Sequence, residues 1–221
     1  MDDRSVDPSA ADSGTITVPG TGRSIVEPDV ADVRLGVSIV RPTAAAAREA
    51  AATTMTAILE AIVGAGVERR DLRTALVALS PVTDYASERG PRVTGYQVMN
   101  TVQVTVRDLA AAGSVIDAGL GAGATSLDGL EFRLADPTVA EETARRSAVE
   151  DARRRAGALA SAAGVTLGPV VGILEGTHPP GPIPFGGGVL GLAMKAEAAE
   201  TPIESGTQEV AVSVVVRFAI G

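Results

Sequence analysis

Apolar and polar residues alternate along much of the chain, which is the pattern of β-strands. Every second residue from Ala31 to Ile39 is apolar and the residues between them are polar or small, so this segment predicts a half-buried strand. Residues 210–220 are apolar on both faces, and we expect them to form a strand that is central in its sheet or covered by a neighbouring element. Shorter segments predict further strands at 15–26, where 19–22 interrupt the pattern, and at 72–82, 93–106, 130–134 and 170–174.

The first of these strands, made of 15–18 and 24–26, is interrupted by Pro19-Gly20-Thr21-Gly22. The two glycines look like the beginning of a dinucleotide-binding fingerprint, but Ile25 stands where the third glycine belongs. A strand also follows where that motif needs a helix. We therefore interpret the glycines as a bulge in an edge strand and expect no nucleotide cofactor.

Three segments have helical spacing instead: 43–63, 108–120 and 137–163. In the first, Met55, Ile58 and Ile62 fall on one face. In the third, Asp136 is the expected N-cap and Pro137 the first helical residue, and Gly164 ends the helix. It has four acid–arginine pairs at a spacing of four residues, and small residues dominate its buried side, so it can lie close to a sheet. The residues expected on that side are Ala144, Ala148, Val149, Ala152, Ala156, Leu159 and Ala163.

The predicted order is strand, strand, helix, strand, strand, helix, strand, helix, strand, strand. Adjacent strands favour antiparallel pairing, so we expect an α+β fold, a mainly antiparallel sheet with three helices packed on it. This domain would span residues 14–221 and follow a disordered tail at 1–13. A Pro/Gly-rich insertion at about 176–206 predicts a long loop before the last strand.

Charge and composition argue against a nucleic-acid partner. Asp and Glu number 27 against 19 Lys and Arg, for a formal net charge of -8. Nucleic-acid affinity comes mostly from clustered basic residues, which this balance disfavours. Aromatic residues make up 2% of the chain, too few for a base-stacking platform.

Composition also removes most routes to catalysis. The chain has no cysteine and one histidine, His178, so thiolate chemistry and the usual histidine-rich zinc sites are excluded. His178 lies in Thr-His-Pro-Pro, where an exposed ring is more plausible than a catalytic base, and no nucleophile motif accompanies it. We expect no enzymatic activity, no catalytic residues, no cofactor and no metal.

Two kinds of candidate contact remain. Asn100 and Tyr96 share a strand face with apolar neighbours and are candidates for a structural polar anchor. For Asn100 the alternatives are a ligand contact and an ordinary core amide whose hydrogen bonds are satisfied, and we favour the core amide because buried polar groups are generally paired. The insertion carries an apolar run that is either an oligomer or partner contact, or a loop packed on its own domain. The residues of that run are Ile183, Phe185, Val189, Leu190, Leu192 and Met194.

No segment has the roughly 18 consecutive apolar residues of a membrane-spanning helix. The first residues, Met-Asp-Asp-Arg, lack the basic start and apolar centre of a secretory signal. The sequence as given therefore predicts a cytoplasmic protein or an exported one whose signal has been removed.

Several segments, in order, resemble the SIMPL-domain family of YggE-like bacterial proteins, over residues 15–220. The matching segments are Thr17-Val18-x-Gly20-x-Gly22, Val26-x-Pro28-Asp29-x-Ala31-x-Val33-x-Leu35-Gly36-Val37, Leu79-Ser80-Pro81-Val82-x-Asp84-Tyr85, Gly95-Tyr96-Gln97-Val98-Met99-Asn100-Thr101-Val102, Ala148-Val149-Glu150-Asp151-Ala152-Arg153 with Leu159-Ala160, and Thr201-Pro202-Ile203-Glu204-x-Gly206-x-Gln208-Glu209-Val210.

This resemblance implies an α+β fold, homo-oligomers that are ring-like or channel-like in some relatives, export to the cell envelope, and a link to oxidative stress. It implies no catalytic residues. The resulting hypothesis is a non-catalytic, self-assembling, stress-related protein that acts as an oligomeric scaffold or channel-like assembly. The alternative is a monomeric module that binds a small molecule or peptide, with Tyr96 and Asn100 near the ligand.

Overall fold

A computed structural model describes residues 14–86, 90–176 and 203–221. The predicted order of strands and helices is confirmed, with two short 3₁₀ turns added, η2 (Arg69–Asp71) and η3 (Leu109–Ala111). The tail at 1–13 and most of the long insertion lie outside the described residues. The elements are β1 (Thr15–Val26), β2 (Val30–Arg41), α1 (Ala44–Gly64), β3 (Leu72–Asp84), β4 (Arg92–Val106), α2 (Ala112–Gly121), β5 (Ser126–Arg133), α3 (Thr138–Ala163), β6 (Leu167–Gly176) and β7 (Gln208–Ile220).

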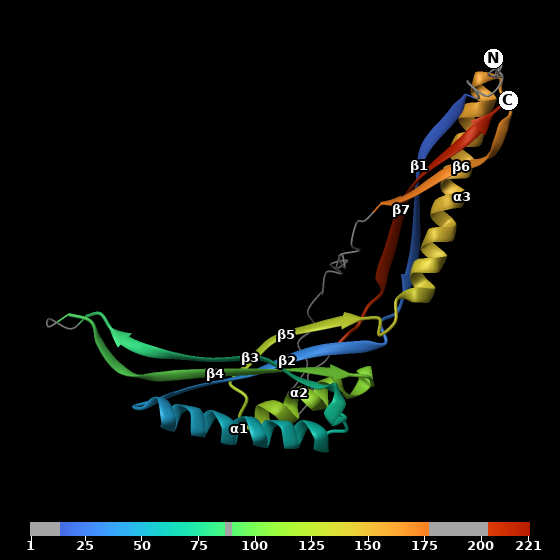
Figure 1. Cartoon of the computed structure of the whole chain (residues 1–221). Helices are drawn as coiled ribbons and strands as arrows, with labels where there is room; N and C mark the ends of the chain where they lie inside the picture. The colour runs from blue at the N-terminus through green and yellow to red at the C-terminus, as the bar shows by residue number, and fades with distance from the viewer. Residues whose placement is uncertain (1–13, 87–89, 177–202) are drawn as a thin grey trace, which may run out of the picture. The chain divides into compact units, whose positions relative to one another are not determined.

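The elements form two compact units, each with its own antiparallel sheet (Figure 1). The terminal unit consists of α3 and a three-stranded sheet in the order β1-β7-β6. The central unit consists of α1, α2 and a four-stranded sheet in the order β3-β4-β2-β5. The α+β class with antiparallel strands is thus confirmed. The strands divide into two sheets because β1 pairs along its whole length with β7, whereas β2 pairs with β4 and β5.

In the terminal unit, β1 is one continuous edge strand. Its pairing with β7 runs from Thr15 opposite Ala219 to Val26 opposite Gln208 without a register shift. The predicted interruption and bulge at Gly20 and Gly22 are therefore wrong. These glycines have a different function: a Cβ atom on Gly20 would overlap the carbonyl oxygen of Ala148, and one on Gly22 that of Ala144. Glycine is needed so that α3 can lie directly on β1.

Helix α3 meets the sheet through a row of buried alanines, as predicted. Gly164, with φ of 72°, ends the helix in the left-handed conformation, also as predicted. Two positions expected on the buried side are exposed instead, Leu159 and Ala163, because the buried row continues to Ala160. The buried row is Ala140, Ala144, Ala148, Ala152, Ala156 and Ala160.

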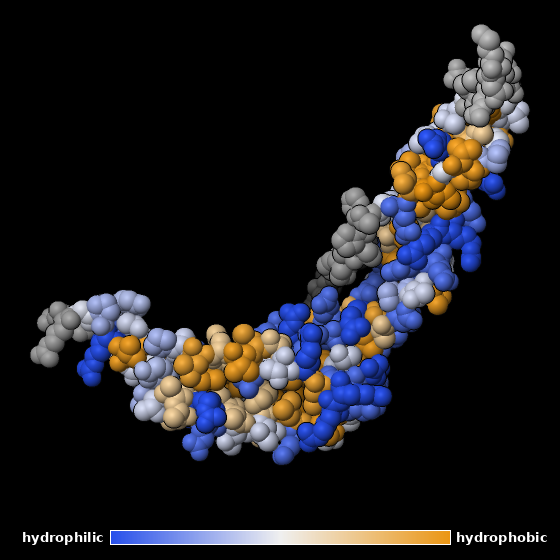
Figure 2. Space-filling model, viewed as in Figure 1, coloured by the Kyte–Doolittle hydropathy of each residue, from blue (hydrophilic) through white to orange (hydrophobic). Residues whose placement is uncertain are grey.

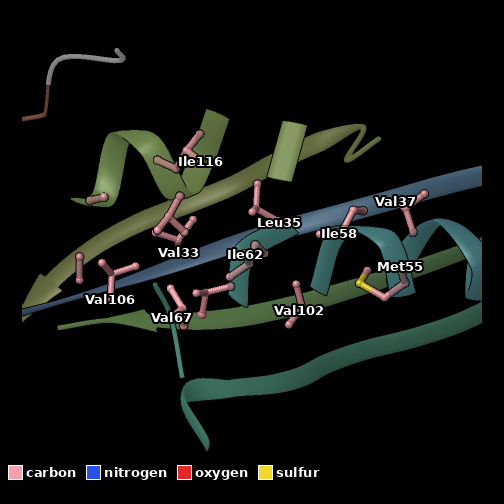
Figure 3. Packing of buried hydrophobic residues seen from close by; sticks show 14 residues of the cluster. Val33, Leu35, Val37, Met55, Ile58, Ile62, Val67, Val102, Val106 and Ile116 are labelled. Carbon is pink, nitrogen blue, oxygen red and sulfur yellow. The ribbon is translucent and has the colours of Figure 1, made fainter. Parts of the chain in front are cut away.

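In the central unit, α1 and α2 cover one face of the sheet (Figure 1). Figure 3 shows the side chains of α1 meeting those of β2, β4 and α2 in the core. The α1 residues include Met55, Ile58 and Ile62, so the predicted helical face is confirmed. Val33 and Leu35 of β2 point into this core. The alternate residues of β2, such as Asp32 and Arg34, lie on the opposite face of the sheet. We call that opposite face the open face, since neither α1 nor α2 packs on it.

Candidate functional site

The two predicted anchor residues lie on the face of β4 that bears α1. Asn100 is half-buried and pairs in register with Val37 of β2 and Val77 of β3. Tyr96 packs beside a small cluster that contains Ala47 and Val98. They share a face, as the sequence indicated, but the cavities described below are lined by other residues. The anchor role of Asn100 stays a prediction.

The predicted contact residues of the insertion lie outside the described residues. These are Ile183, Phe185, Val189, Leu190, Leu192 and Met194. Their role as an oligomer or partner contact also stays a prediction.

Instead, the open face of the central unit carries a polar network centred on Asp32. Among the described residues Asp32 is the one buried charged residue, with 9% of its surface exposed. Its carboxylate accepts hydrogen bonds from Thr105 Oγ1 at 2.6 Å and Gln103 Nε2 at 3.1 Å. Arg133 donates two more, from Nε at 2.8 Å and Nη2 at 3.3 Å. Both oxygens of Asp32 are therefore occupied, as a buried carboxylate requires.

This network continues to the edge of the sheet. Gln103 Oε1 accepts a hydrogen bond of 2.7 Å from Arg73 Nη2. Arg73 lies on β3, Gln103 on β4, Asp32 on β2 and Arg133 on β5, so one line of hydrogen bonds crosses all four strands. The sequence placed Asp32 on the polar side of its strand, but its partners are 71 to 101 residues away and no local pattern identifies them.

The electrostatics of the network favour the charged forms. Burial alone would raise the pKa of Asp32, but the hydrogen bonds from Arg133 and Thr105 and the positive charge of Arg133 outweigh it, and the pKa is lowered. The hydrogen bond to Asp32 raises the pKa of Arg133. Asp32 and Arg133 thus form an ion pair at neutral pH.

A second ion pair lies nearby. Arg107 binds both oxygens of Asp71, from Nε at 2.9 Å and Nη2 at 2.6 Å, which is the two-pronged geometry that arginine favours with carboxylates. The Asp71 side chain is 7% exposed, and the hydrogen bond from Arg107 lowers its pKa. This pair ties η2 to the residue that follows β4.

Between the Asp32 network and this ion pair lies a cavity of about 330 Å³, which we call the arginine pocket. A smaller cavity of about 210 Å³ shares Asp71 and Thr105 with it. Guanidinium groups dominate the lining of the arginine pocket, together with an amide, a hydroxyl and a carboxylate that Arg107 already binds. The lining residues of the arginine pocket are Arg70, Asp71, Arg73, Gln103, Thr105 and Arg133.

Exposed apolar side chains gather on one edge strand of each unit (Figure 2). In the terminal unit four of them lie on β6, and in the central unit three lie on β3, where Val77 is 66% exposed. We call these surfaces the β6 apolar edge (Val170, Val171, Ile173 and Leu174) and the β3 apolar edge (Leu76, Val77 and Leu79).

In the ranges 14–86, 90–176 and 203–221, no helix is long and apolar enough to cross a membrane. The same ranges contain no group of three or more His, Cys, Asp or Glu side chains that could hold a metal ion.

Comparisons with known proteins give relatives but no activity. A protein from Brucella melitensis named "26 kDa periplasmic immunogenic protein" is 35% identical over 210 residues, which cover 93% of this chain and 84% of the relative. A protein from Edwardsiella ictaluri named "Uncharacterized protein YggE" is 29% identical over 158 residues, which cover 72% of this chain and 66% of the relative. The Escherichia coli protein of the same name is 26% identical over 162 residues, 73% of this chain and 65% of the relative.

A family model also covers nearly the whole chain. The SIMPL model, described as "Protein of unknown function (DUF541)", matches residues 16–218. The resemblance read from the sequence motifs is therefore confirmed. This chain belongs to the SIMPL family, whose function is unknown.

Proposed function

We propose that this protein is a non-catalytic, self-assembling protein in which copies of the chain join through the β6 apolar edge. One observation carries the proposal. Four large apolar side chains on this strand are exposed, Val170 by 37%, Val171 by 49%, Ile173 by 51% and Leu174 by 73%. Large apolar side chains gathered at an exposed sheet edge are typical of an interface.

The middle of the strand, residues 170–174, also lacks the usual protection of a sheet edge. β6 has one neighbour, β7, within the part of the chain that the structure describes. Exposed edges in soluble monomers are commonly protected by charged side chains, proline or a covering segment. In β6, Pro169 stands near the beginning and Glu175 near the end, and the five residues between them, 170–174, are uncharged.

We infer that the occupant of this edge is a second copy of the chain. Two antiparallel copies of one edge strand are self-complementary, because each offers its own backbone donors and acceptors to the other around a twofold axis. Charge favours this segment as the meeting point. The chain has a net charge of -8, so copies repel one another, and an uncharged strand lets them approach with the least repulsion.

The β3 apolar edge supports assembly beyond a dimer. It is the edge of the other sheet, with Leu76 exposed by 47% and Leu79 by 49%. A subunit with two separate apolar edges can bind two neighbours, which is the requirement for a closed ring or a larger scaffold. This supports the scaffold or channel-like form of the proposal.

We further propose an envelope location, supported by the word periplasmic in the name of the Brucella relative. The link to oxidative stress comes from the family resemblance alone and stays a prediction. A non-catalytic role is supported by the sequence, which has no cysteine and one histidine.

Light scattering after size-exclusion chromatography tests the assembly. We expect the full chain to have a mass of several subunits, and Val171→Glu combined with Leu174→Glu to lower that mass by placing like charges across the interface. The matched control is Val139→Glu combined with Leu159→Glu, which adds the same two charges at apolar positions of α3 that are 74% and 52% exposed and should leave the mass unchanged.

Two results would contradict the proposal. The first is a monomeric wild-type chain at the highest concentration reached, which would favour the monomeric binding module instead. The second is an oligomer that keeps its mass when both glutamates are present.

A further inference from the structure

We propose that the arginine pocket binds a small multivalent oxyanion, a ligand with two or more phosphoryl or carboxylate groups. The pocket lies on the open face of the central unit, whereas the β6 apolar edge belongs to the terminal unit. The inference goes beyond self-assembly and does not depend on it.

Arg73 is the centre of this proposal. Within the described residues its guanidinium makes one hydrogen bond, to the uncharged amide of Gln103, and no carboxylate lies in ion-pair range. A guanidinium has five N–H donors, so four remain for a ligand. A full positive charge with unused donors at the wall of a cavity is a ready anion contact.

The Asp32 network holds Arg73 in place. Gln103 donates from Nε2 to Asp32, and this bond turns its Oε1 toward Arg73. Asp32 is in turn fixed by Thr105 and Arg133. Orienting a cation before the ligand arrives lowers the entropy cost of binding.

The carboxylates of the pocket do not compete for these cations. Both oxygens of Asp71 are bound by Arg107, and both oxygens of Asp32 are occupied within the network. Each carboxylate is therefore neutralised by an arginine of its own. Glu131 lies opposite Asp32 in register but does not line the pocket.

Two more guanidinium groups line the pocket. Arg133 donates from Nε and Nη2 to Asp32 and from Nη1 to the backbone oxygen of Leu134, and its side chain remains 41% exposed. Arg70 is 70% exposed and bound through Nη2 to the exposed Glu68, a weak pair that a ligand can displace. Arg34 adds positive charge from outside the lining, because register places it beside Gln103, on the other side from Arg73.

The arrangement selects for more than one anionic group. The three arginines of the lining come from η2, β3 and β5, so a ligand with several anionic groups can contact more of them than a monovalent ion can. Guanidinium forks pair with phosphate and carboxylate oxygens alike. A diphosphate and a tricarboxylate are therefore the two probes of the same chemistry.

Calorimetric titration of the full chain with pyrophosphate and with citrate, at low and matched ionic strength, tests the proposal. We expect at least one of them to bind, more weakly as salt is added because the site is open to solvent. Binding of pyrophosphate alone identifies a phosphoryl ligand, and binding of citrate alone identifies a polycarboxylate.

Arg73→Gln should weaken this binding about tenfold, the usual effect of losing a charged hydrogen-bonding partner. The matched control is Arg48→Gln, which removes the same charge from an exposed position of α1, the helix on the other face of the sheet. Melting temperatures of both variants show whether either has lost its fold.

The proposal is overturned if neither pyrophosphate nor citrate binds more tightly than chloride at the same ionic strength. It is overturned as well if folded Arg73→Gln binds the probe with the affinity of the wild type. It is also overturned if Arg48→Gln weakens binding as much as Arg73→Gln, since the effect would then be one of net charge. Light scattering is measured on the same samples, so failure here is distinguishable from failure of self-assembly.

Discussion

Burying the carboxylate of Asp32 would destabilise the fold if the group had no partners, but its hydrogen bonds offset that loss. A carboxylate with 9% exposure loses most of its hydration, which is unfavourable unless hydrogen bonds replace the water. Four hydrogen bonds from three side chains do so here. The network therefore depends on the charge of Asp32 as well as on its shape.

Asp32→Asn keeps the shape and removes the charge. We expect it to lower the free energy of unfolding by about 1–3 kcal/mol, because Arg133 loses its counter-charge and Asn cannot accept all four bonds. Urea denaturation measures the change. Glu131→Gln, at an exposed carboxylate on the same face, should stay within about 0.5 kcal/mol of the wild type. Equal effects of the two variants would contradict this reading of the network.

The sequence predicts the environment of some single residues and not of others. Alternation placed Asp32 on the polar side of its strand, because that pattern is local. It could not reveal that Asp32 is buried or that Arg133 faces it, because those facts depend on which strands pair. Asn100 was singled out because it is a polar residue in a row of apolar ones. That signal is local and needs no knowledge of which strands pair.

At the scale of elements, the packing of α3 on β1 depends on small residues on both sides. Alanines face the sheet from α3, and Gly20 and Gly22 face the helix from β1. Small residues on the helix were evident from the sequence. The glycines of β1 were misread because their reason is a contact with a helix more than 100 residues later in the chain.

Gly22→Ala tests this packing. The new Cβ would overlap the backbone of α3 at Ala144 and Ala148, so the helix must shift, and we expect a loss of about 1–3 kcal/mol in the free energy of unfolding. The control is Gly157→Ala on α3, where nothing lies within 4 Å of the new atom. Ala is the better helix former, so Gly157→Ala should stabilise by about 0.5–1 kcal/mol. A neutral Gly22→Ala in denaturation experiments would show that α3 does not rest on β1 as closely as described.

Element boundaries were predictable where the periodicity was unbroken. The first and third helices begin and end within a residue or two of their predicted positions, since their capping and stop signals are local. β5 begins at Ser126, four residues before its prediction, because a register shift opposite Arg34 and Leu35 breaks the alternation there. β6 begins at Leu167 rather than 170, since Gly168 and Pro169 interrupt its apolar pattern.

At the scale of the whole molecule, the order of elements followed from the sequence and the division into two units did not. That division depends on β1 pairing with β7, from opposite ends of the chain. The alternation of apolar and polar residues within a strand does not indicate which distant strand it pairs with.

Both units share one electrostatic property, which gives a last prediction. The pKa values of Asp32 and Asp71 in the central unit, and of Asp136 and Asp151 in the terminal unit, are lowered from 3.8. The main lowering causes are hydrogen bonds from Arg133, Arg107, Thr138 and the backbone of Thr21, respectively.

A carboxyl whose pKa is lower in the folded than in the unfolded state stabilises the fold above its unfolded value, and this stability is lost as the pH falls through the folded value. We therefore expect the free energy of unfolding to be nearly constant from about pH 8 to 5 and to decrease below about pH 4. Urea denaturation across this range measures it. Asp32→Asn should flatten the decrease, since one of the titrating groups is gone. A chain whose stability rises on acidification below pH 4 would contradict the assignment, because the carboxyls would then be more stable in their protonated forms.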